Sequence, residues 1–187
     1  MTSGEIKSGA YGSHQDYRTW RTYDEYYNRE EMWPATEYPD ADLHYMSEAG
    51  CYVVSLCIMM RMSGIVAESD FQKFNPLIFC EKLKSGNGFF NDGSVNVEKL
   101  PEIFPLRIVD SIPYNRDDLA SSLSEGYACQ IIVKGRNAPQ HYVVPVKVTE
   151  SDVEIIDPSW DKTRLSELEP IWIVRYLKNE EITNRNL

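Results

Sequence analysis

The stretch Cys51-Tyr-Val-Val-Ser-Leu-Cys-Ile-Met-Met-Arg-Met-Ser63 decides how the rest of the chain must fold. It is apolar on nearly every side, so a helix formed here must be buried all round rather than lie on a surface. Gly64 follows at once and suits the C-terminal cap of a helix. The β-branched residues would also allow a strand, but the length of the run and its end at glycine favour a central, buried helix.

Helices and strands fall into two blocks along the chain. The pair Asn75-Pro76 is typical of a helix start, and Gly86 and Gly88 are expected to end that helix. Further helical stretches are expected at Val97–Leu100 and Asp117–Leu123. Helices first and strands later predict an α+β domain, with a mostly antiparallel sheet packed against the central helix. The strands are expected at Leu106–Val109, Ala128–Val133, Tyr142–Val148, Val153–Ile156 and Ile171–Tyr176.

The length of 187 residues suits one domain. Residues 1–45 are rich in aromatic and charged side chains without a regular period, which predicts an irregular arm that wraps the domain. Residues 46–178 are expected to form that domain. The polar tail, residues 179–187, is expected to fray.

The charge excludes several classes of partner. Lys and Arg total 19 against 29 Asp and Glu, a net charge of −10 that repels nucleic acid and anionic membrane surfaces. No apolar run is long enough for a membrane span or a signal peptide, so a cytoplasmic protein is the default expectation. The four cysteines lack the spacing of a zinc site or a disulfide scaffold, and reduced thiols are expected.

Three residues form a candidate catalytic set. Cys51 stands where an irregular segment turns into the buried helix, and a helix N-terminus favours a thiolate. His141 lies at the entry to an apolar strand, and Asp157 ends the next strand, so a hairpin would bring the two together. Taken singly, each has an ordinary structural explanation: a buried thiol, a satisfied histidine and a turn. The order Cys, His, Asp on suitable elements instead predicts a nucleophile, its base and the carboxylate that orients the base.

Several motifs resemble the papain-like cysteine peptidases related to the bacteriocin-leader-processing, double-glycine peptidases of the C39 type. The stretch 46–60 is similar to the nucleophile helix of that family, which carries a Gly-Cys pair followed by Ser and Met. The remaining matches come in the family's order: Phe74-Asn-Pro76, Gly86-Asn-Gly-Phe-Phe90, His141-Tyr-Val-Val144 and Ile156-Asp-Pro-Ser159. The resemblance spans roughly residues 14 to 175 and implies a papain-like fold with a central nucleophile helix.

The resemblance also implies a mechanism. The family uses a Gln ahead of the nucleophile as an oxyanion donor, and Gln15, in Gln15-Asp-Tyr-Arg-Thr-Trp20, is similar to it. Thiolate attack on an amide carbonyl needs no metal or organic cofactor. The implied substrates are peptides or proteins, with glycine-containing peptides or peptidoglycan cross-bridges among them. The oligomeric state stays open.

Two other functions remain open at this level. An acyl transferase of transglutaminase type would use the same triad but pass the thioester to an amine. A catalytically silent domain would keep the fold only for binding. Tyr52 favours the silent domain, because the family often has a small residue there and a bulky one would narrow the active-site mouth or change its selectivity.

Overall fold

The structure is a computed structural model that describes residues 50–66, 76–90, 94–136, 140–158 and 162–178. The expected arm and tail lie outside the described residues. The helices are α3 (Cys51–Met62), α4 (Pro76–Ser85), α5 (Leu100–Ile103) and α6 (Arg116–Ser124), with short 3-10 turns η4 (Val97–Lys99) and η5 (Leu165–Glu167). The strands are β1 (Leu106–Pro113), β2 (Ala128–Lys134), β3 (Gln140–Val148), β4 (Val153–Ile156) and β5 (Pro170–Lys178).

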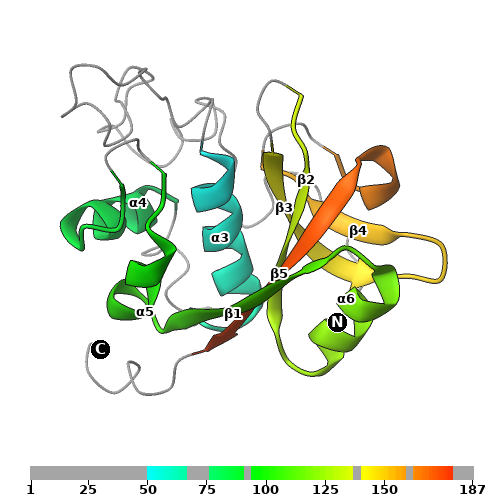
Figure 1. Cartoon of the computed structure of the whole chain (residues 1–187), viewed down its shortest axis with the longest axis horizontal. Helices are drawn as coiled ribbons and strands as arrows, with labels where there is room; N and C mark the ends of the chain where they lie inside the picture. The colour runs from blue at the N-terminus through cyan, green and yellow to red at the C-terminus, as the bar shows by residue number, and fades with distance from the viewer. Residues whose placement is uncertain (1–49, 67–75, 91–93, 137–139, 159–161, 179–187) are drawn as a thin grey trace.

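The strands form one open antiparallel sheet with the order β1-β5-β2-β3-β4. The predicted α+β class is therefore confirmed in the described part of the chain, and all five expected strands are present. Helices α4 and α5 lie on one side of α3, and the sheet lies on the other side (Figure 1). Helix α3 packs against β3, β2 and α4, as expected of a helix that is apolar all round.

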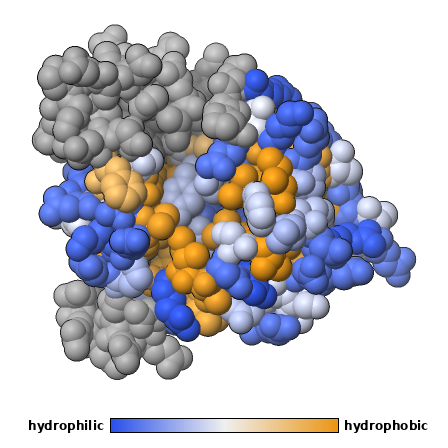
Figure 2. All heavy atoms as spheres, viewed as in Figure 1, coloured by the Kyte–Doolittle hydropathy of each residue, from blue (hydrophilic) through white to orange (hydrophobic). Residues whose placement is uncertain are grey.

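The sheet has an apolar core on each face. Neighbouring residues of a strand point to opposite faces, so Val144 of β3 joins the core around α3 while Val143 joins a second core with α6 and η5. The first core includes a stacked aromatic pair, Phe79 and Phe104, whose ring centroids are 4.2 Å apart. On the face drawn in Figure 2, hydrophobic residues gather in the middle and hydrophilic residues lie around them. No helix of the described part is long and apolar enough to cross a membrane.

The ends of α3 and α4 follow different rules. Helix α3 ends as predicted, because Gly64 has a φ of +71° and takes the left-handed conformation that glycine tolerates. After α4 the left-handed residue is Asn87, with φ 54°, and neither Gly86 nor Gly88 has a positive φ. The glycines serve a close approach instead: a Cβ on Gly86 would come within 2.6 Å of the Ile103 side chain. The two glycines are therefore explained by a tertiary contact, the packing of α5 against this turn.

Candidate active site

Cys51 is the first residue of α3 and differs from the other cysteines in its environment. It follows Gly50, which has no side chain to cap the helix, and no acidic residue stands in the first turn. The unpaired N–H groups of a helix start and the positive end of the helix dipole favour a thiolate at this position, and no carboxylate of the first turn opposes them. Cys51 is partly exposed, whereas Cys57, Cys80 and Cys129 are buried. Burial raises the pKa of all three buried thiols, that of Cys80 and Cys129 to about 12.

His141 and Asp157 meet through the hairpin of β3 and β4. The register pairs Val144 with Ile156, and one further step places Asp157 opposite Val143, diagonal to His141. Diagonal neighbours on one face of a sheet are within reach of longer side chains. The Nε2 atom of His141 lies 2.8 Å from Oδ1 of Asp157, and their side chains are 5% and 0% exposed.

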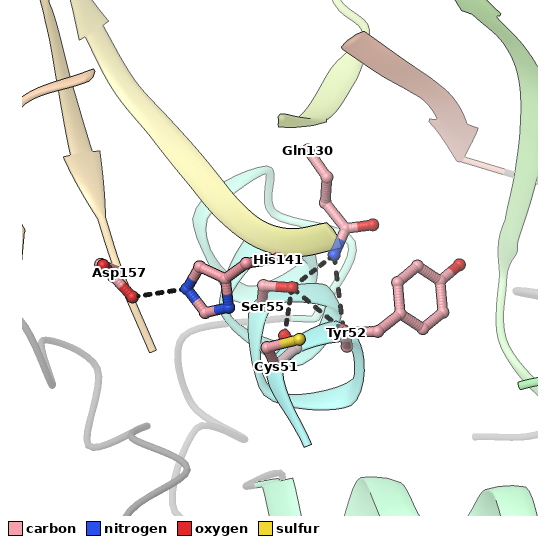
Figure 3. A network of polar contacts seen from close by, with 6 residues as sticks. All are labelled: Cys51, Tyr52, Ser55, Gln130, His141 and Asp157. Carbon is pink, nitrogen blue, oxygen red and sulfur yellow. Dashed lines mark hydrogen bonds and ion pairs between the residues drawn. The ribbon is translucent and has the colours of Figure 1, made fainter. Parts of the chain in front are cut away.

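The imidazole of His141 lies between the carboxylate and the thiol. Figure 3 shows Nε2 directed at Asp157, while the other ring nitrogen, Nδ1, is on the side of Cys51. Burial lowers the pKa of His141, but hydrogen bonds to Asp157 and Cys51 and the nearby negative charge outweigh burial and raise it to about 9. An imidazolium that is stable near neutral pH can stand beside a thiolate, which is the reactive form of a cysteine.

A buried polar network behind Cys51 was not predicted from the sequence. Ser55 Oγ lies 2.6 Å from the carbonyl oxygen of Cys51 and 3.1 Å from that of Tyr52. Gln130 Nε2, from β2, lies 2.7 Å from Ser55 Oγ, and the Tyr176 hydroxyl donates to Gln130 Oε1. The available signal was one polar residue inside each of two apolar runs, Ser55 in the helix and Gln130 in the strand.

Tyr52, the residue after Cys51, belongs to the same network. Its hydroxyl lies 3.3 Å from the hydroxyl of Tyr176, and its ring meets Tyr142 edge to face with centroids 4.7 Å apart. Burial raises the pKa of Tyr142 to about 12, with a smaller contribution from the charge of Cys51. The two rings thus pack against each other, and hydrogen bonding inside the domain occupies the Tyr52 hydroxyl.

The structure brings together three of the four residues singled out from the sequence: Cys51, His141 and Asp157. The fourth, Gln15, lies outside the described residues. Within the described ranges, no group of His, Cys, Asp and Glu has an arrangement that could hold a metal ion. The arrangement of thiol, imidazole and carboxylate can support proton transfer from sulfur to nitrogen, followed by nucleophilic attack.

Comparison of the chain with protein-family models, with curated proteins and with solved structures finds no match in any of the three.

Proposed function

We propose that this protein is a thiol-dependent amide hydrolase, a cysteine peptidase of papain-like fold that acts on peptide or protein substrates. One observation carries the proposal: a buried His141–Asp157 pair, 2.8 Å apart, presents the second ring nitrogen of its imidazole to Cys51 at the start of α3 (Figure 3). An isolated structural cysteine needs neither a base nor a carboxylate behind that base. The set of all three in the order required for proton transfer is typical of nucleophilic catalysis.

The proposed reaction has two stages. His141 accepts the thiol proton, the sulfur of Cys51 bonds to the amide carbonyl carbon, and the carbonyl electron pair moves to oxygen. The C–N bond then breaks as His141 gives its proton to the leaving nitrogen, which leaves a thioester. Water attacks the thioester carbonyl carbon and gives a proton to His141. The C–S bond then breaks, the carboxylic acid product leaves, and the proton on His141 returns to the Cys51 sulfur.

Asp157 and the helix start have supporting roles in this scheme. Asp157 orients His141 through Nε2 and so presents Nδ1 to the thiol. The backbone N–H groups of the first turn of α3 are donors for the oxyanion that forms on the carbonyl oxygen. Gln15 is the side-chain oxyanion donor that the family resemblance implies.

The test is the rate of iodoacetamide labelling at Cys51 as a function of pH, read by peptide mass spectrometry in the wild type and in His141→Ala. The other three cysteines are buried, so slow labelling of their thiols would show only that the reagent cannot reach them. They therefore cannot serve as references for the reactivity of Cys51. The urea-unfolded chain, in which Cys51 is an ordinary exposed thiol, is therefore the reference.

We expect wild-type labelling to stay fast well below about pH 8, and to lose this behaviour in His141→Ala. Labelling of the folded protein that follows the pH profile of the unfolded chain, or that ignores the His141 substitution, would refute an activated thiol. Hydrolysis of a peptide library that stops in Cys51→Ala would then establish the reaction. Products that form only when an amine is added would identify an acyl transferase instead.

A further inference from the structure

We propose that Ser55, Gln130 and Tyr176 are positioning residues, which hold the first turn of α3 in place and so aim the Cys51 thiol at His141. This inference rests on the proposed function and goes beyond it, because none of the three touches the proposed reacting atoms. Ser55, Gln130 and Tyr176 are each 0% exposed. They come from the helix and from two paired strands, β2 and β5, so the network ties the nucleophile to the middle of the sheet.

The chemistry of the groups sets the direction of the hydrogen bonds. Gln130 Oε1 carries no hydrogen, so Tyr176 must donate to it. The Tyr176 oxygen must then accept from the hydroxyl of Tyr52. At its other end Gln130 donates through Nε2, 2.7 Å from Ser55 Oγ and 3.4 Å from the Tyr52 carbonyl oxygen. Ser55 in turn donates to the Cys51 carbonyl, and Figure 3 shows this part of the network behind the thiol.

The helix start has particular need of this support. Helices commonly begin with a side chain that accepts from the first N–H groups, and such a cap fixes the first turn. Gly50 precedes α3 and has no side chain for this purpose. The contact of 2.6 Å from Ser55 to the Cys51 carbonyl, backed by Gln130, holds the turn from inside the domain instead. The N–H groups at the helix start are thereby left for a substrate oxyanion.

A shift of the first turn would move sulfur away from the imidazole. Buried polar networks that are fully satisfied specify one geometry, and removal of one member leaves its partners without a hydrogen bond. Reactive groups lose rate steeply when they are misplaced by about 1 Å. Loss of the Ser55 hydroxyl should therefore lower the labelling rate of Cys51 strongly, while the domain stays folded.

The experiment compares Ser55→Ala with Ser122→Ala. Ser122 is also a buried helical serine, 1% exposed, whose hydroxyl donates to the carbonyl four residues back, Asp118, at 2.7 Å. It lies in α6, away from the start of α3 in Figure 1. Both variants lose one hydroxyl that donates to the carbonyl four residues back, so Ser122→Ala corrects for the cost of that contact, and only Ser55 also accepts from Gln130. The measurements are the iodoacetamide rate at Cys51 against pH and the midpoint of urea unfolding.

We expect Ser55→Ala to lower the labelling rate at about pH 7 by roughly tenfold to a hundredfold and to move its pH profile upward. Ser122→Ala should keep the wild-type rate. A Ser55→Ala protein that is folded and labels like the wild type overturns the inference and leaves the proposed function standing. A wild type whose Cys51 is not activated overturns both.

A second variant separates the network from Ser55 alone. Tyr176→Phe removes only the hydroxyl that donates to Gln130, and leaves the Ser55 hydroxyl in place. We expect a fall in labelling rate in the same direction as in Ser55→Ala, but smaller. An unchanged rate in Tyr176→Phe would remove Gln130 and Tyr176 from the positioning role.

Discussion

Asp157→Asn tests the electrostatic role of the carboxylate while it keeps the shape of the side chain. The amide oxygen of asparagine can still accept a hydrogen bond from His141 Nε2. The substitution therefore keeps the hydrogen bond, which is 2.8 Å long in the wild type, and removes the negative charge. The pKa of His141 is raised from 6.5 to about 9, which corresponds to roughly 3 kcal/mol at about 1.4 kcal/mol per pKa unit. Without the carboxylate charge, burial still lowers the pKa while the contacts with Cys51 still raise it, so the pKa should fall from about 9 toward its ordinary value of 6.5. At about pH 7.5 a pKa of about 9 leaves nearly all of the imidazole protonated and a pKa of 6.5 would leave about one tenth, so the loss of protonation measures how far the pKa falls.

The assay is an NMR titration of the histidine ring signals in the wild type and in Asp157→Asn. The chain has three histidines, and the signal that is missing in His141→Ala identifies His141. The other two signals serve as internal references for the pH scale. A pKa of His141 that stays near 9 in Asp157→Asn would refute the reasoning, because the charge of Asp157 would then not be what holds the proton.

Two further predictions concern stability. His141 binds its proton more tightly in the folded than in the unfolded protein, so its contribution to the free energy of unfolding is complete below about pH 6.5 and is lost as the pH rises toward about 9. Urea unfolding across this window should show a steeper fall for the wild type than for Asp157→Asn, and equal slopes would contradict the raised pKa. Phe79→Ala should cost about 3–5 kcal/mol of unfolding free energy, because Phe79 is 0% exposed and stacks on Phe104. A loss below about 1 kcal/mol in urea unfolding would show that this stack is not a main support of the core.

Local sequence rules were sufficient for most elements of the fold. Apolar periodicity located α3 and every strand of the sheet, because each of these segments buries apolar side chains whichever neighbour covers them. Helix α4 ends at Ser85, directly before Gly86 as predicted, but the left-handed residue is Asn87, and the glycines beside it make room for Ile103. Sequence spacing cannot reveal such a contact, because Ile103 lies on another helix.

The sequence by itself determined the helix that begins at Cys51, the hairpin that carries His141 and Asp157, and the antiparallel character of the sheet. These follow from local patterns of apolar residues, glycine and turns. Only the tertiary structure decided that Gln130 and Ser55, 75 positions apart, meet behind Cys51, and that Tyr52 turns its hydroxyl toward Tyr176. The physical reason is that buried polar groups choose partners by proximity in the folded domain, and the packing of α3 on the sheet creates that proximity.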